Sequence, residues 1–230
     1  MTPAAPRLRA RAVIIDLDGT LLDTAADLAA AVNLMLAELG RPVLPESTVA
    51  AYVGRGAEVL VHRALGGGLE ARVDAATHER GHEAFMRHYH ATNGLHARAY
   101  PGVHEGIAAM QAKGLRLACV TNKPQAFADP LLVRCGLHAA FELVLGGDAL
   151  ATKKPDPAPM LHAAQALGAA PAEVVAIGDS INDALAARAA GMAVLAVPYG
   201  YNEGRDVRSL DVDAIVDSLL AAASLIDPIA

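Results

Sequence analysis

The chain has 230 residues and a formal net charge of −6 at pH 7, and 53% of its residues are hydrophobic but only 3% aromatic. This acidic balance argues against a surface that binds nucleic acid or an anionic membrane, although a metal ion can still make one pocket attractive to an anion. The length suits one large domain or two modest ones.

The N-terminal segment and the cysteines bear on cellular location. An apolar stretch follows Arg11 and ends already at Asp16, too soon for a signal peptide or a membrane span. The only cysteines, Cys119 and Cys135, form no C-x-x-C pair, so a disulfide framework is not expected. We therefore expect a cytoplasmic protein.

The first predicted strand covers residues 12–15, and Asp16-Leu17-Asp18-Gly19-Thr20 follows it directly. Side chains alternate along a strand, so Asp16 and Asp18 are expected on the same side. Two neighbouring carboxylates repel each other, and such an arrangement is costly without a cation or a catalytic task. The pair therefore indicates phosphoryl-transfer chemistry.

A segment without strand-like runs follows, from Thr24 to about His96. Its apolar residues recur at helical spacing, and glycines follow several of the predicted helices. The pattern predicts helices over residues 24–39, 46–53, 57–65 and 69–90. We expect a helical cap over residues 23–96, inserted into a core formed by residues 1–22 and 97–230.

From Leu115 onward, strand-like and helix-like segments alternate. Apolar runs cover residues 115–120, 141–145, 173–177 and 192–197, and helical patterns cover residues 124–134, 157–167 and 182–190. Such alternation predicts an α/β fold with a doubly wound parallel sheet. Asp16 and Asp18, Thr121 and Asn122, and Asp179 each follow an apolar run, and ligands bind beyond the carboxyl ends of such strands. These polar residues are therefore expected to meet at one edge of the sheet.

Four motifs in order resemble those of the haloacid dehalogenase-like phosphohydrolase superfamily. They are the D-x-D-G-T of residues 16–20, Thr121 after an apolar strand, Lys154 before a proline, and the G-D-x-x-x-D of residues 178–183. The helical insertion resembles the cap of the first subclass of this superfamily. Longer stretches resemble the bacterial phosphoglycolate phosphatases in particular: residues 53–57, 100–103, 120–124, 153–157 and 199–202.

This resemblance implies a role for each motif residue. Asp16 is the expected nucleophile, which forms an aspartyl-phosphate. Asp18 is the expected acid that protonates the leaving group and then the base that activates water, and its presence favours phosphate esters over haloacids. Thr121 donates a hydrogen bond to the phosphate, and Lys154 neutralises the phosphate and the nucleophile.

The resemblance also implies a Mg²⁺ ion as cofactor. Its expected ligands are Asp16, Asp179 and the main-chain carbonyl of Asp18, and Asp183 orients either Lys154 or a metal-bound water.

Two further residues are candidates for substrate binding. Arg55, between Gly54 and Gly56, either reaches a carboxylate of the substrate or belongs to a turn between helices. Asn122 and its neighbour Lys123 either contact the substrate or form the entry to a helix.

The resulting hypothesis is a phosphatase for a small phosphate ester, most specifically 2-phosphoglycolate, which acts as a monomer or small homo-oligomer. The alternatives are a phosphosugar phosphatase, a mutase of the β-phosphoglucomutase type, and a catalytically silent binding protein on the same fold.

Overall fold

The computed structural model describes residues 7–229, so residues 1–6 and 230 of the predicted core lie outside the described part. Its centre is a parallel sheet with the strand order β6-β5-β2-β7-β8-β9. The strands are β2 (Ala12–Ile15), β5 (Arg116–Val120), β6 (Leu143–Leu145), β7 (Val174–Gly178), β8 (Ala193–Ala196) and β9 (Ala214–Ile215). β2 and β7 are buried along their whole length, which explains their uninterrupted apolar sequences.

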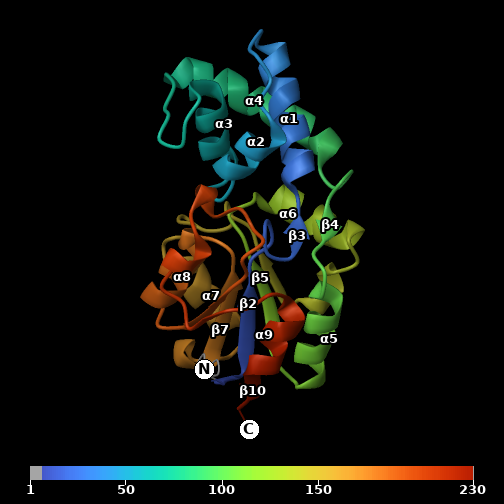
Figure 1. The fold of residues 1–230 in the computed structure, drawn as a ribbon, viewed down its shortest axis with the longest axis vertical. Helices are drawn as coiled ribbons and strands as arrows, with labels where there is room; N and C mark the ends of the chain where they lie inside the picture. Colours follow the sequence, from blue (N-terminus) through green and yellow to red (C-terminus); the bar gives the residue numbers. More distant parts are fainter. Residues whose placement is uncertain (1–6, 230) are drawn as a thin grey trace.

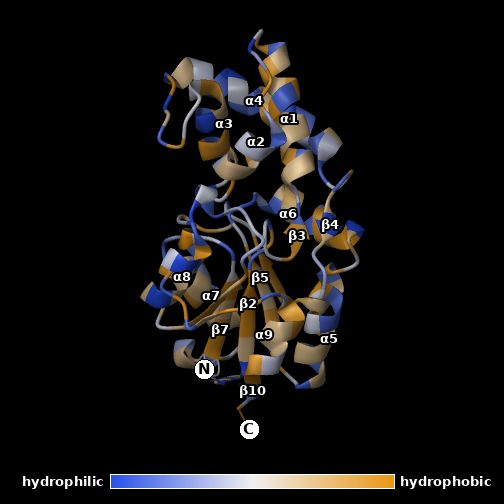
Figure 2. Cartoon of the chain, viewed as in Figure 1, coloured by the Kyte–Doolittle hydropathy of each residue, from blue (hydrophilic) through white to orange (hydrophobic). Residues whose placement is uncertain are grey.

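Helices cover both faces of this sheet (Figure 1). Val13 and Ile15 of β2 pack toward α5, α6 and α9, whereas Ala12 and Ile14 pack toward α7 and α8, as the alternation of side chains along a strand requires. The strands form the most hydrophobic part of the chain in Figure 2. These helices are α5 (Val103–Ala112), α6 (Gln125–Arg134), α7 (Ala158–Ala166), α8 (Ile181–Ala189) and α9 (Leu219–Leu225).

Four helices between β3 and β4 form a separate layer above the carboxyl ends of the strands (Figure 1). They are α1 (Ala25–Glu38), α2 (Glu46–Tyr52), α3 (Ala57–Gly66) and α4 (Ala75–Thr92). They share an apolar core that includes Met35, Val61 and Phe85, and Phe127 of α6 extends this core into the sheet domain. The predicted fold class, a doubly wound parallel α/β sheet with a helical cap, is confirmed.

Two small sheets complete the fold. β3 (Leu22–Asp23) pairs with β4 (Arg98–Ala99) in antiparallel orientation, so the chain leaves and re-enters the core domain at one place. β1 (Leu8–Ala10) pairs in parallel with β10 (Ile226–Pro228) and brings the two ends of the chain together.

One predicted helix begins later than expected. The pattern predicted a helix from residue 69, but α4 begins at Ala75, because the Asp74 carboxylate accepts a hydrogen bond from the Thr77 N–H at 3.0 Å and caps the helix there. Gly81 inside α4 permits close packing on α3, since a Cβ at this position would lie 2.6 Å from the Leu65 Cδ1.

Candidate active site

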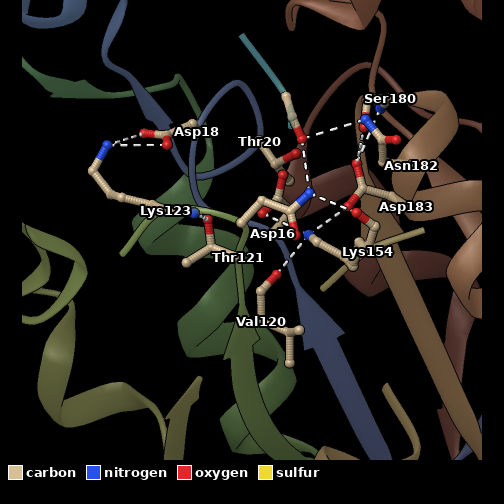
Figure 3. Close-up of polar contacts among 12 residues, drawn as sticks. Asp16, Asp18, Thr20, Val120, Thr121, Lys123, Lys154, Ser180, Asn182 and Asp183 are labelled. Carbon is tan, nitrogen blue, oxygen red and sulfur yellow. Dashed lines mark hydrogen bonds and ion pairs between the residues drawn. The ribbon is translucent and has the colours of Figure 1, made fainter. Parts of the chain in front are cut away.

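Three neighbouring strands deliver polar side chains to the edge of the sheet beneath the cap. β2 pairs with β5 on one side and with β7 on the other. Asp16 follows β2 and donates its N–H to the Ile177 carbonyl at 3.0 Å, Thr121 follows β5, and Asp179 follows β7. The predicted convergence is therefore present, and Figure 3 shows Asp16 and Thr121 close to Lys154.

A cluster of three carboxylates lies at this edge. Asp16, Asp179 and Asp183 each offer one oxygen, and the three oxygens lie within 4.8 Å of one another. Asp179 is held from both sides: Thr20 Oγ1 donates to its Oδ1 at 2.9 Å, and the Tyr201 N–H donates to its Oδ2 at 2.7 Å. The cluster is thus held in place by contacts from two separate parts of the chain.

Lys154 Nζ lies inside this cluster. It is 2.8 Å from Asp16 Oδ1 and 2.6 Å from Asp183 Oδ1, and it donates to the Val120 carbonyl at 2.7 Å. Burial alone would lower the pKa of Lys154, but Asp16 and Asp183 together raise it above its ordinary value. The ammonium is therefore charged. Ser180 fixes the other oxygen of Asp183 through its N–H and its hydroxyl, at 3.1 and 2.6 Å.

The single positive charge of Lys154 does not neutralise the three carboxylates of the cluster. Burial, and then the Asp183 carboxylate, raise the pKa of Asp16 well above its ordinary value. The same two causes raise the pKa of Asp179 to about 7. Asp16 Oδ1 is buried and accepts no aligned hydrogen bond within the described residues. Three carboxylates around one ammonium fit a hard divalent cation as an additional partner, because the cation would relieve the repulsion between the carboxylates.

The Asp18 carboxylate is directed away from this cluster, toward Lys123 (Figure 3). Lys123 Nζ lies 2.8 and 3.0 Å from its two oxygens, and Thr24 Oγ1 donates to Oδ1 at 2.7 Å. Asp16 and Asp18 nevertheless line one cavity, as expected from their spacing. The Asp18 carboxylate is thus engaged by Lys123 and Thr24 and does not join the cluster of Asp16, Asp179 and Asp183.

This cavity lies between the sheet and the cap and has a volume of about 40 Å³. Its floor is polar, and its roof consists mostly of apolar side chains of the cap helices. The floor residues are Asp16, Asp18, Thr121, Asn122, Lys123, Lys154, Ser180 and Asp183, and the larger roof side chains are Leu28, Val53, Leu60, Phe85 and Tyr89.

Of the two further candidates for substrate binding, Asn122 lines the cavity and Arg55 does not. Asn122 lines the cavity, and its Nδ2 donates to the carbonyls of Gly54 and Lys154, both at 2.8 Å, so it ties the cap to the sheet domain. Arg55 does not line the cavity: its Nε lies 3.3 Å from the buried Glu203 carboxylate. The contact of Arg55 with a substrate carboxylate stays a prediction, because its ion pair with Glu203 is made through Nε.

Lys123, which the sequence singled out only as the neighbour of Asn122, also lines the cavity. Its side chain is only 2% exposed, and it contacts a residue 105 positions earlier in the chain. The sequence signal for a role of Lys123 in the site was its position two residues after Thr121, close to the end of the predicted strand.

Comparison with known proteins identifies the class. Residues 10–191 match the family of haloacid dehalogenase-like hydrolases, and the chain belongs to this family. It is 54% identical over 216 residues to a phosphoglycolate phosphatase of Nitrosospira multiformis, with 94% of this chain and 95% of that protein aligned. It is 51% identical over the same length and the same shares to a phosphoglycolate phosphatase of Thiobacillus denitrificans.

A solved structure is similar throughout. A protein from Haemophilus somnus, described as a predicted phosphoglycolate phosphatase, superimposes with a TM-score of 0.88 at 33% sequence identity, over 94% of this chain and 97% of that one. Family and relatives confirm the expectation of a phosphoric monoester hydrolase. Within residues 7–229, no helix is both long and apolar enough to cross a membrane.

Proposed function

We propose that this chain is a Mg²⁺-dependent phosphatase that hydrolyses 2-phosphoglycolate to glycolate and phosphate through an aspartyl-phosphate on Asp16. The observation that carries the chemistry is the buried cluster of Asp16, Asp179 and Asp183 around Lys154, under a cavity that also contains Asp18. The choice of substrate is supported by relatives of about half-identical sequence that bear the name phosphoglycolate phosphatase.

Asp16, Asp179 and the main-chain carbonyl of Asp18 are the proposed ligands of Mg²⁺, with Asp183 close enough to bind it directly or through water. When bound, the ion would offset the negative charge of the phosphate and of the nucleophile. At about 4 Å, one pair of like charges repels by roughly 4 kcal/mol at an effective dielectric constant near 20. Lys154 contacts both Asp16 and Asp183, and its positive charge also offsets the negative charge of the phosphate and the nucleophile.

Each residue of the cavity floor has a separate role in the proposed reaction. Asp16 attacks phosphorus and forms the covalent intermediate, while Thr121 donates a hydrogen bond to a phosphate oxygen. Asp18 protonates the ester oxygen as it leaves and then removes a proton from the water that cleaves the intermediate. Lys123 and Thr24 hold the Asp18 carboxylate in place for both steps.

The roof of the cavity favours a small substrate. Leu28, Val53, Leu60 and Phe85 offer no side-chain hydrogen-bond partners, so the hydroxyls of a sugar phosphate would be left unsatisfied there. This argues against a phosphosugar phosphatase or a mutase of the β-phosphoglucomutase type. An apolar roof over the site also limits the access of water to an aspartyl-phosphate.

A substrate panel tests the proposal. Release of inorganic phosphate from 2-phosphoglycolate, glucose 6-phosphate and β-glucose 1-phosphate is measured with Mg²⁺ and after treatment with a chelator. We expect the highest kcat/KM for 2-phosphoglycolate, and no turnover without a divalent ion. A preference for a sugar phosphate, or formation of an isomeric sugar phosphate, would overturn the assignment; inactivity on every ester would indicate the binding protein.

Three further expectations belong to this proposal. Residues 23–96 act as the cap, and residues 1–22 and 97–230 as the catalytic core. The enzyme is a monomer or small homo-oligomer, which light scattering measures. It acts in the cytoplasm on a small molecule, without a nucleic-acid partner.

A further inference from the structure

The cavity contains one positively charged group that lies outside the acidic cluster of Asp16, Asp179 and Asp183. Two lysines line it, Lys154 and Lys123. Lys154 donates hydrogen bonds to Val120 and Asp183 and forms an ion pair with Asp16, so its charge is already engaged by the acidic cluster. Lys123 contacts the two oxygens of Asp18, and its remaining polar interaction is with the neighbouring Tyr89 hydroxyl.

A hydroxyl lies next to this ammonium. Lys123 Nζ is 4.9 Å from the centre of the Tyr89 ring, and Tyr89 also lines the cavity. The Tyr89 hydroxyl is buried and finds no hydrogen-bond acceptor within residues 7–229. Burial raises the pKa of this phenol, which keeps it protonated and able to donate. A buried donor without an acceptor is costly, unless a ligand supplies the acceptor.

The positions of Lys123 and Tyr89 match a ligand that carries a carboxylate close to its ester oxygen. Asp18 protonates the ester oxygen in the proposed reaction, and Lys123 contacts Asp18, so Lys123 lies beside the leaving group. In 2-phosphoglycolate the carboxylate carbon is only two bonds from that oxygen. The other roof side chains near this end are apolar, and the amide hydrogens of Asn122 are used by Gly54 and Lys154.

We propose that Lys123 and the Tyr89 hydroxyl form the subsite for the carboxylate of the substrate, so that Lys123 determines specificity for phosphate esters of 2-hydroxy acids. This inference rests on the proposed phosphatase function and assigns to Lys123 the part that the motif analysis considered for Arg55. The ammonium supplies positive charge and the phenol donates a hydrogen bond to one carboxylate, and both side chains are buried, which strengthens such contacts.

The test compares two esters that differ only in the group to be recognised. 2-Hydroxyethyl phosphate has a CH₂OH where 2-phosphoglycolate has the carboxylate. The quantity measured is the ratio of kcat/KM for the two esters, which is independent of the fraction of active enzyme. Any damage to Asp18 affects both esters equally, so it cancels in the same ratio.

For Lys123→Met, we expect the ratio of 2-phosphoglycolate to 2-hydroxyethyl phosphate to fall roughly 10- to 100-fold, the usual effect of losing a hydrogen bond to a charged group. For Tyr89→Phe, which keeps the ring packing, we expect a fall of roughly three- to tenfold. The matched control is Lys153→Met, because Lys153 lies outside this cavity and contacts Glu58 at 3.7 Å. Its ratio should equal that of the wild type.

Two results would overturn the inference, and they are distinguishable. If the wild type prefers 2-phosphoglycolate and Lys123→Met keeps that preference while both activities fall alike, Lys123 serves only Asp18 and the proposed function survives. If the wild type shows no preference for the carboxylate ester, the choice of substrate fails together with the subsite.

Discussion

Arg63 and Glu203 form a buried ion pair between the cap and the loop after β8: Arg63 Nη2 lies 2.6 Å from Glu203 Oε1, and the two side chains are 0% and 1% exposed. Arg63 also donates to the carbonyls of Tyr52 and Leu69, both at 2.8 Å. This guanidinium therefore joins α2, α3 and the following loop to the sheet domain.

Because both charges are buried, the loss of one partner is expected to be costly. Arg63→Met should lower the free energy of unfolding by about 3–5 kcal/mol, since it leaves Glu203 buried without its nearest cation. Urea denaturation followed by circular dichroism measures this change. Arg205→Met is the control, because Arg205 is half-exposed and lies 3.5 Å from the other oxygen of Glu203. It should cost less than about 1 kcal/mol. Equal effects of the two substitutions would contradict the importance of burial.

This ion pair also shows where prediction from the sequence ends. The central strands were predictable because sheets covered on both faces require unbroken apolar runs, as in residues 174–178. The edge strand β6 lies within the predicted run 141–145, but β9 and the strands of the two small sheets consist of two or three residues, too few for a periodic pattern. Arg63 and Glu203 are 140 residues apart, and nothing local in the sequence connects them.

The candidate site also contains residues that the sequence predicted and contacts that it did not. The positions of Asp16, Thr121 and Asp179 were predictable because each directly follows a strand, and Lys154 was found through the proline that follows it. The partner of Arg55 depends on how the cap lies on the sheet domain, and that of Lys123 on how the loops after β2 and β5 meet, which no spacing records. Both side chains pair with a carboxylate of the protein, but only Lys123 lines the cavity.

The proposed nucleophile gives the most direct test of mechanism. Asp16→Asn should reduce kcat for 2-phosphoglycolate by at least about a thousandfold, because an amide does not attack phosphorus. The variant should fold, since the side chain keeps its size and a carboxylate is removed from a crowded acidic cluster. Phosphate release and thermal unfolding are measured together. Asp206→Asn, at an exposed carboxylate, is the control and should retain wild-type activity. Substantial turnover by Asp16→Asn would exclude the covalent route.

The acidic cluster predicts a pH dependence of stability. Burial and Asp183 raise the pKa of Asp179 from 3.8 to about 7 in the folded protein. The folded state then holds this proton more tightly than the unfolded state. The resulting stabilisation is complete below about pH 4 and is lost as the pH rises through 7. Without metal, the contribution of Asp179 to stability should thus decrease by up to about 4 kcal/mol between these limits.

The measurement is thermal unfolding of the metal-free wild type and of Asp179→Asn across this pH range. The wild type should lose stability relative to the variant as the pH rises. Mg²⁺ should raise the Tm of the wild type more at pH 8 than at pH 5, because protons compete with the cation for the carboxylates. A Mg²⁺ effect that is equal at both pH values, or larger at pH 5, would show that this cluster does not hold the ion.

Gly19 provides a test of how closely the first loop approaches the cluster. It has a φ of +85°, and a Cβ there would lie 2.4 Å from Asp179 Oδ2. Gly19→Ala should therefore displace the Asp179 carboxylate and weaken Mg²⁺ binding by roughly 10- to 100-fold, the range seen when the support of a metal ligand is disturbed. Titration of activity against Mg²⁺ concentration measures the effect.

The control for Gly19→Ala is Gly40→Ala. Gly40 also has a positive φ, +66°, but a Cβ there meets no atom within 4 Å. Both substitutions should cost about 1 kcal/mol of stability, because alanine is strained in this backbone conformation. Only Gly19→Ala should shift the Mg²⁺ requirement, since only its added methyl group reaches the carboxylate. If the two variants required the same Mg²⁺ concentration as the wild type, the contact between residue 19 and Asp179 would have no part in metal binding.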